Sequence, residues 1–313
     1  MPIETTRKEL FNHPTVSRTT VQGRSAVLFS LPFLGFGIYI VLLALNIIPV
    51  GNSHFHVPRH LVAAFGGLFF MAGLSVLVCG LQGLMAHAQF IQRQKEHPHE
   101  LWLIDFPWDK RGTYSDNMDR VLNACYGCLG CTLFLVPFNW FAFFADVNVL
   151  FVKIVLAIFN IILLISWGYT VYLLLQFIKY GRSFLQFDRF PFLIGDQVSV
   201  TLKTRRPIEG LKSMTFILRC IQERYEVRGT GKNRQSVVAV YQIYAETITV
   251  EELGHYQPQG GLQWPISFAI PNDPEFLTQL SQRPARYWQL EVKAVTPGID
   301  FAANFLVPVY KGN

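Results

Sequence analysis

Charged residues are scarce in this chain of 313 residues. Asp, Glu, Lys and Arg make up 15% of it, whereas in a soluble globular protein they make up about a quarter. Apolar residues account for 51% of the chain. This balance excludes an ordinary soluble enzyme and is typical of a protein with membrane-spanning segments.

The short motifs of common catalytic chemistry are also missing. The sequence contains no Gly-x-Ser-x-Gly nucleophile elbow, P-loop, His-Glu-x-x-His zinc motif or dinucleotide-binding fingerprint. Glu251 and Glu252 are adjacent, and on a strand adjacent side chains point to opposite faces, so they do not form an acid–base pair. We therefore expect a protein that is not an enzyme and that needs no cofactor.

The apolar residues are concentrated in four long runs. A helix needs about 20 apolar residues to cross the roughly 30 Å hydrocarbon core of a bilayer, and each run is long enough. The last run contains only two charged residues, Lys153 and Lys179, one near each end. The sequence predicts a four-helix transmembrane domain over residues 26–180. Its spans are expected at about 26–50, 61–85, 121–145 and 149–180.

Lys and Arg are unevenly distributed between the segments that join these spans. They are frequent in the tail 1–25 and in the loop 91–120, whereas the alternate loops contain Arg59 and Lys153. The positive-inside rule then places the tail, the loop and the chain beyond the last span in the cytoplasm. We expect a multi-pass protein of the inner (cytoplasmic) membrane with both termini cytoplasmic and the tail loosely ordered or in a short surface helix. The orientation of the spans and contact with anionic lipid account for the net charge of +6, so nucleic acid is not an expected partner.

Small residues recur along the second run. They include Gly73, Cys79, Gly80 and Gly83, and small residues at such intervals let two helices approach closely in lipid. The sequence therefore predicts a helix-packing seam in this span. An oligomeric channel or a lipid-handling protein, with the glycines as contacts between copies, is one alternative for the function.

Two clusters contain residue types that bind metal ions. They are three histidines in the first outer turn, His54, His56 and His60, and three cysteines in the third run, Cys125, Cys128 and Cys131. Such sets could bind zinc, copper or an iron–sulfur cluster. The simpler interpretations are solvated loop histidines and small packing residues, because a straight helix presents cysteines poorly to an ion. A metal- or cofactor-bearing membrane subunit is a second alternative for the function.

The predicted cytoplasmic loop is rich in aromatic residues. Trp102, Phe106 and Trp108 alternate with acidic residues and are followed by Lys110 and Arg111. Such a mixture suits the lipid headgroup zone or docking onto another protein, and we predict that these five residues bind a partner. The stretch His97–Asn117 resembles a segment of a family of bacterial inner-membrane proteins that join membrane helices to a β-domain. That resemblance implies no known activity.

Beyond residue 181 the long apolar runs give way to short alternating ones. Tyr287 to Lys293 alternates most clearly, and turn residues separate many of the runs, as in Arg228 to Asn233 and Pro271 to Pro274. This punctuation predicts a soluble all-β sandwich over residues 186–313. The expected strands are 197–202, 213–227, 236–250, 263–270, 287–295 and 301–309.

The second half of this region is similar to the closing half of an arrestin-like sandwich. Three motifs carry the resemblance: P-x-x-F-x-I-P from Pro265 to Pro271, W-x-L-x-V-x-A from Trp288 to Ala294, and F-x-x-P-V from Phe305 to Val309. Another immunoglobulin-like sandwich would produce a similar pattern. The resemblance implies a protein-binding module that uses sheet edges or loops, with Trp264 and Trp288 in its core.

The leading functional expectation combines these parts. We expect a non-enzymatic membrane protein whose helices anchor a cytosolic sandwich in the lipid bilayer. The sandwich would bind a membrane or cytosolic partner protein, or the chain would serve as a scaffold subunit of a membrane complex. Homo-oligomers are compatible with the same sequence.

Overall fold

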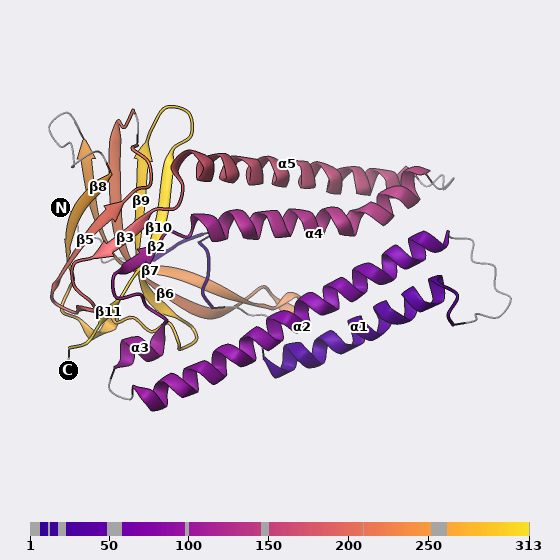
Figure 1. Cartoon of the computed structure of the whole chain (residues 1–313), viewed down its shortest axis with the longest axis horizontal. Helices are drawn as coiled ribbons and strands as arrows, with labels where there is room; N and C mark the ends of the chain where they lie inside the picture. The colour runs from indigo at the N-terminus through magenta and orange to yellow at the C-terminus, as the bar shows by residue number, and fades with distance from the viewer. Residues whose placement is uncertain are drawn as a thin grey trace. The chain divides into compact units, whose positions relative to one another are not determined.

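The computed structural model describes residues 7–11, 13–17, 23–48, 58–97, 100–144, 150–208, 210–251 and 262–312, without the side chains of Leu101 and Lys232. The chain forms two compact units (Figure 1). One contains Thr20–Gln92 and Asn123–Val171 and is helical. The other combines Met1–Thr19, Arg93–Leu122 and Tyr172–Asn313 and contains the β-sheets. Three separate parts of the chain therefore build the β-unit.

Four helices in the described part of the chain are long and apolar enough to cross a membrane. They are α1 (Arg24–Ala44), α2 (Arg59–Glu96), α4 (Asn117–Phe144) and α5 (Leu150–Tyr180). They fall on the four apolar runs of the sequence. Helix α2 continues well beyond its apolar run, because the polar residues after it keep good helix propensity.

Helices α1 and α2 pack through glycines. Gly66, Gly73 and Gly80 of α2 are buried and lie seven residues apart, on one face of the helix. A Cβ atom on Gly73 would lie 2.8 Å from the backbone nitrogen of Leu34 in α1, and one on Gly80 would lie 3.0 Å from that of Val27. Only glycine allows the two backbones this close.

Helices α4 and α5 run side by side (Figure 1), and polar side chains join them. The side-chain amides of Asn139 and Asn160 exchange hydrogen bonds of 3.1 and 2.6 Å. A second contact lies seven residues before Asn139 in α4 and seven residues after Asn160 in α5. There the Trp167 indole donates to Thr132 Oγ1 at 3.1 Å. Such bonds between helices are expected for the few polar residues of a membrane span.

The β-unit contains two larger antiparallel sheets and one short parallel pair. The first sheet has the order β1-β7-β6-β9-β10, the second β2-β3-β5-β8, and β4 pairs with β11. The strands of the first sheet are β1 (Lys8–Glu9), β6 (Ser213–Arg228), β7 (Gln235–Glu251), β9 (Arg286–Val295) and β10 (Phe301–Val307). Those of the second are β2 (Gly112–Tyr114), β3 (Phe184–Phe187), β5 (Gln197–Lys203) and β8 (Gln263–Ala269). The pair consists of β4 (Phe192–Leu193) and β11 (Val309–Tyr310).

The core of the β-unit follows the alternation of its strands. Val198, Val200 and Leu202 of β5 are at most 1% exposed and belong to the same hydrophobic cluster as Trp288 and Leu290 of β9. This confirms a C-terminal sandwich with Trp264 and Trp288 buried. The structure differs from the predicted strands at Pro308, where the last strand divides into β10 and β11 because proline cannot donate to the ladder. It also contains the short strands β3 and β4, which precede the first predicted strand.

The tail and the loop are part of the sandwich, unlike the expectation from the sequence. Strand β1 of the tail pairs with β7, and β2 of the loop pairs with β3, so each extends one sheet at its edge. Helix α3 (Leu101–Asp105) also lies in the loop. These elements have two to five residues, which is too short for a periodic pattern to reveal them.

The last turns of α5 belong to the β-unit and form hydrogen bonds with the turn between β9 and β10. The Lys179 ammonium donates to the carbonyls of Pro297 and Ile299 at 3.0 and 2.9 Å. The hydroxyls of Tyr180 and Thr296 are 2.6 Å apart. These bonds join the end of the last candidate span firmly to the sandwich.

Candidate functional site

A second hydrophobic cluster covers the outer face of the five-stranded sheet. Residues of the sheet meet the tail and the loop there. Its buried members are Trp108, Ile221, Val240, Leu280, Ala285, Tyr287 and Tyr310, and Leu10, Val16, Trp102, Phe106, Phe190 and Leu306 pack against them. The aromatic residues of the loop are therefore used to cover the chain's own sheet.

Asp105 at the end of α3 holds this cover in place. Its carboxylate accepts hydrogen bonds from the backbone N–H groups of Leu280 and Ser281 at 2.8 and 2.6 Å. The Tyr310 hydroxyl also donates to it at 2.9 Å, and accepts from the Trp108 indole at 2.9 Å. Burial, followed by the charge of Asp105, raises the pKa of Tyr310, so its hydroxyl stays a donor. The carboxylate thereby ties the loop to β11 and to the segment before β9.

The tail is held by a second carboxylate, which is buried. We call residues 7–11 and 13–17 the N-terminal strap. Glu223 of β6 is fully buried and accepts hydrogen bonds from the N–H groups of Val16 and Ser17 at 2.6 and 2.7 Å. The Ser17 hydroxyl accepts a bond of 3.0 Å from the N–H of Ala285. Because an unpaired buried carboxylate is costly, Glu223 strongly favours the bound strap.

Between the strap and the loop lies a hollow of about 440 Å³, which we call the strap cleft. Aromatic rings and polar groups share its lining. They include Phe106, Trp108, Tyr114, Tyr287, Asp109, Asp116, Asp119, Arg182, Gln289 and Asn304. Three carboxylates and one cation thus line the cleft, and the Arg182 guanidinium lies 4.6 Å from the centre of the Tyr114 ring. Aromatic walls with a few convergent polar groups are typical of binding sites.

Asp116 is the most unusual group of the strap cleft. Its Oδ2 accepts from the Asn304 amide at 3.2 Å, whereas its Oδ1 is buried and has no hydrogen-bond partner among the described residues. Burial raises the pKa of Asp116, against the opposing effects of Asn304 and the nearby Arg120. A ligand that brings a donor or a positive charge to Oδ1 would relieve this penalty.

The predicted partner-binding residues divide into two groups. Trp108 is 9% exposed, Trp102 and Phe106 are half-buried, and all three pack on the chain's own sheet. Lys110 and Arg111 are exposed in the turn before β2. Phe106 and Trp108 also line the strap cleft, so part of the predicted set lies at the site. Its role in binding a partner stays a prediction.

Sequence reasoning missed the polar groups of this site. Asp105, Asp116, Arg182 and Asn304 lie in different parts of the chain, and no motif connects them. A weak signal was available for Asp116, because Asp next to the first residue of a helix is a preferred N-cap. Its partial burial and its neighbour Asn304 become visible only in the structure.

The candidate metal ligands that the structure describes belong to the helical unit. His54 and His56 are outside the described residues, and the ring of His60 at the start of α2 lies 5.5 Å from the Trp140 ring. Cys128 is buried with its sulfur 3.2 Å from Thr170 Oγ1, Cys125 is half-buried, and Cys131 is exposed. Within the part of the chain that the structure describes, His, Cys, Asp and Glu form no group of three able to hold an ion. The metal site stays a prediction.

Three of the four predicted packing residues, the glycines, lie at the contact with α1 or the residue before it, and the fourth is exposed. Gly73 and Gly80 meet α1, and a Cβ atom on Gly83 would lie 3.2 Å from the nitrogen of Gly23. Cys79 lies on an exposed part of α2. The glycine seam therefore joins two helices of the same chain.

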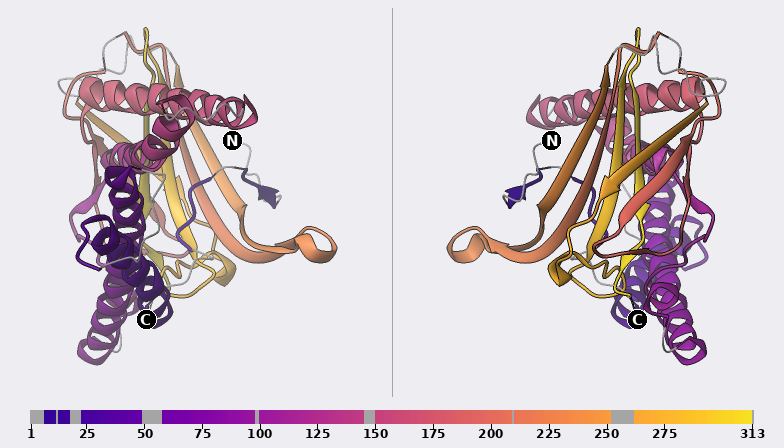
Figure 2. Two further views of the ribbon diagram at one scale, coloured as in Figure 1. Left: turned by 90° about the vertical axis from the view of Figure 1, so that its right-hand side faces the viewer. Right: turned by 90° about the vertical axis from the view of Figure 1, so that its left-hand side faces the viewer.

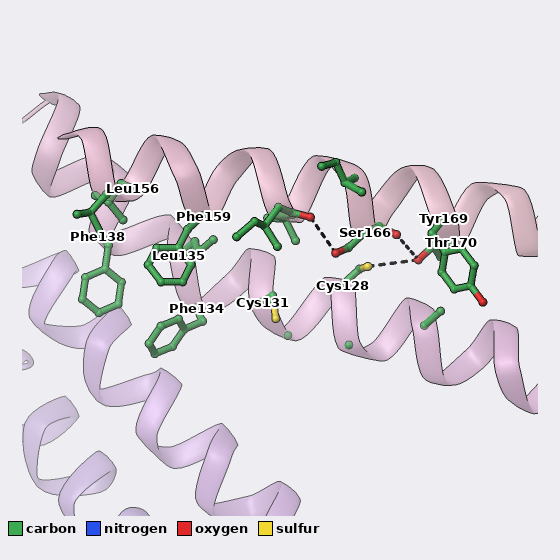
Figure 3. Close-up of a pocket in the computed structure, with 17 residues that line it drawn as sticks. Cys128, Cys131, Phe134, Leu135, Phe138, Leu156, Phe159, Ser166, Tyr169 and Thr170 are labelled. Atoms are coloured by element: carbon green, nitrogen blue, oxygen red, sulfur yellow. Dashed lines mark hydrogen bonds between the residues drawn. The ribbon is translucent and has the colours of Figure 1, made fainter. Parts of the chain in front are cut away.

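A larger apolar groove of about 1030 Å³ runs along α4 and α5 (Figure 3). Phe134, Phe138 and Phe159 point into it together with Cys131. The hydroxyls of Ser166 and Thr170 donate to carbonyls of their own helix, which leaves the groove apolar in character. This surface offers packing area for lipid or a helix and no evident chemistry.

The comparisons with known proteins are limited. No protein-family model matches the chain, and no curated protein matches it. The crystal structure of the sporulation control protein Spo0M from Bacillus subtilis has 13% identity and a TM-score of 0.23 over 42% of this chain and 49% of that chain. The β-glucosidase from Listeria innocua in complex with gluconolactone has 14% identity and a TM-score of 0.15, over 42% of this chain and 16% of that chain. Less than half of each of these proteins is matched, and at such TM-scores neither supports an argument about function.

Proposed function

We propose that this chain is a multi-pass protein of the bacterial inner membrane that presents an arrestin-like sandwich in the cytoplasm and binds a partner protein. The strap cleft carries the proposal, because it combines aromatic walls with a buried carboxylate oxygen that has no partner in the described part of the chain. The chain would act as a non-enzymatic anchor or scaffold. The distribution of Lys and Arg between the loops supports the cytoplasmic side.

The chemistry of the cleft favours a basic segment of the partner. Asp109, Asp116 and Asp119 outnumber Arg182 of the lining and the nearby Arg120, so the cleft carries a negative charge when these groups are ionised. A Lys or Arg side chain can lay its aliphatic stem along Phe106 and place its charge next to Asp116 Oδ1. The partner would thus supply both the apolar contact and the missing donor.

Photo-crosslinking in native membranes tests this site. The photoreactive residue p-benzoylphenylalanine replaces Thr113, which lines the strap cleft, or Gln263, which is exposed on β8 and serves as the control position. We expect a crosslinked protein with the probe at position 113 that is missing with the probe at 263. Equal crosslinking from both positions would reject the cleft as the binding site.

Charge variants sharpen the test. Asp116→Asn together with Asp119→Asn should reduce the crosslink from position 113 by about tenfold or more, since a charge-assisted bond to the partner is lost. Asp188→Asn changes an exposed carboxylate outside the cleft and should leave the crosslink as it is. Elemental analysis of the purified chain covers the alternative, because stoichiometric metal would favour a metal-bearing subunit.

A further inference from the structure

The hairpin of β6 and β7 extends beyond the rest of its sheet. The two strands stay paired as far as Arg228 and Gln235, whereas β9 accompanies β6 only to Gln222. Strand β1 pairs with β7 only at Tyr241 and Gln242. We call Glu223–Arg228 and Gln235–Val240, with the turn between them, the ribbon. Figure 2 shows it curving away from the remaining strands of the sandwich.

The ribbon has an apolar face that its own unit leaves open. Tyr225 lies opposite Val238, and Val227 opposite Ser236, so these residues share one face. Tyr225 is 45% exposed and Val227 67% exposed. A two-stranded ribbon is marginally stable in water, and an apolar face without a cover adds to that cost.

The turn of the ribbon is basic. Arg228, Lys232 and Arg234 lie in it or border it, and no acidic residue lies between Arg228 and Gln235. From Arg224 to Arg234 the chain has four cations and a single acid, Glu226. Hydrogen bonds from Tyr241 and Arg228 lower the pKa of Glu226, so it stays ionised and paired within the ribbon. Arg228 also pairs with Glu9 of the tail, so the positive charge that remains at the turn is that of Lys232 and Arg234.

We propose that the ribbon docks with its basic turn and apolar face onto the anionic headgroups of the membrane. The proposal rests on the four candidate spans crossing that membrane, and it does not depend on the strap cleft. Lys and Arg are attracted to anionic lipid, and a tyrosine beside them suits the headgroup zone, where one end is apolar and the other hydrated. Because the spans hold the chain at a bilayer, the lipid surface has a high effective concentration for the ribbon. An acidic protein could bind the same basic turn, but it would have to arrive as a separate molecule without this gain in concentration. Binding of such a protein is the competing outcome of the test.

The test uses the full chain in nanodiscs of phosphatidylcholine alone or of phosphatidylcholine mixed with phosphatidylglycerol. Hydrogen exchange is followed for peptides that cover residues 224–238. We expect exchange to be about tenfold slower, or slower still, in the anionic discs, and this difference to disappear at high salt. Equal exchange in both kinds of disc would overturn the proposal. Protection that appears only when a cytosolic extract is added would overturn it as well, in favour of a protein partner.

Two sets of variants separate charge from apolar contact. Lys232→Gln with Arg234→Gln should remove the difference between the discs, whereas Lys212→Gln, at an exposed site outside the ribbon, should keep it. Val227→Asn should reduce the protection in anionic discs, whereas Val295→Asn, on another exposed valine, should not. Unchanged exchange in peptides of β5 shows that each variant is folded. A charge variant that keeps the full difference would contradict the proposal.

Discussion

The two units of this chain bury their apolar residues in opposite ways. Trp288, Leu290 and Val292 of the sandwich are completely buried by the chain itself. In the helical unit, no more than 22% of the residues in any of the four apolar stretches are buried. The sandwich therefore forms its own apolar interior, whereas the helices leave most of their apolar surface exposed, as is typical of helices that span a bilayer.

The units also differ in how their parts are connected. In the sandwich, Asp105 and Glu223 are buried or partly buried carboxylates that bind backbone N–H groups of distant segments. In the helical unit, glycine contacts and the Asn139–Asn160 pair connect neighbouring helices. Loss of a polar group should hence be more harmful in the sandwich, because its interior offers no replacement partner. Four experiments test how each unit is held together, from the largest expected effect to the smallest.

Asp105→Ala should destabilise the sandwich most. Two backbone N–H groups and the Tyr310 hydroxyl lose their acceptor, and each unsatisfied group costs about 1–3 kcal/mol, so we expect a loss of about 3 kcal/mol or more. Asp109→Ala is the control, since that carboxylate accepts from Arg111 N–H at the surface. Thermal unfolding of the solubilised chain, followed by near-UV circular dichroism, measures both. Equal unfolding midpoints for the two variants would contradict the role of Asp105.

Gly66→Val should separate α1 from α2. Its side chain would meet Ile40 and the backbone nitrogen of Val41, which lie 2.8 and 2.9 Å from the position of a Cβ atom, and overpacking costs about 1–3 kcal/mol. Gly67→Val, one residue further along, has open space around it and provides a matched control. Disulfide crosslinking between cysteines introduced into α1 and α2 reports the contact. If both variants crosslink equally well, the seam does not depend on Gly66.

Asn139→Leu and Asn160→Leu test the amide pair of α4 and α5. Hydrogen bonds between membrane helices contribute about 0.6 kcal/mol on average, so each single variant should lose about that much, and the double variant little more. Asn123→Leu replaces an exposed amide on α4 and should have no such effect. Reversible unfolding in mixed micelles supplies the double-mutant cycle. Strictly additive losses would show that the two amides are not coupled.

Asp116→Asn should have the smallest effect, and in the stabilising direction. The pKa of Asp116 is raised in the folded chain, so its ionisation costs stability as the pH rises through that pKa. At neutral pH the variant should unfold at a slightly higher temperature than the wild type. The difference should vanish below pH 3.8, the ordinary pKa of Asp, where the carboxyl is neutral in both states. A lower unfolding midpoint at neutral pH would show that the carboxylate is already satisfied.

Much of the fold was accessible from the sequence, because long elements leave a periodic record. The continuous apolar runs predicted α1, α2, α4 and α5, and the alternation around Trp288 predicted β9. The candidate site was accessible only in part. Phe106 and Trp108 stood out by composition, whereas Asp116 and Asn304 are 188 residues apart and show no pattern that relates them.

The sequence by itself determined that this chain has four apolar helices followed by a sandwich, since burial in lipid and burial between sheets each impose a local pattern. Only the tertiary structure decided that the tail and the loop complete the sandwich and enclose the strap cleft. The physical reason is the separation of the partners. Trp108 meets Tyr310 across 202 positions and Ser17 meets Ala285 across 268, and such contacts are chosen by packing of the whole unit.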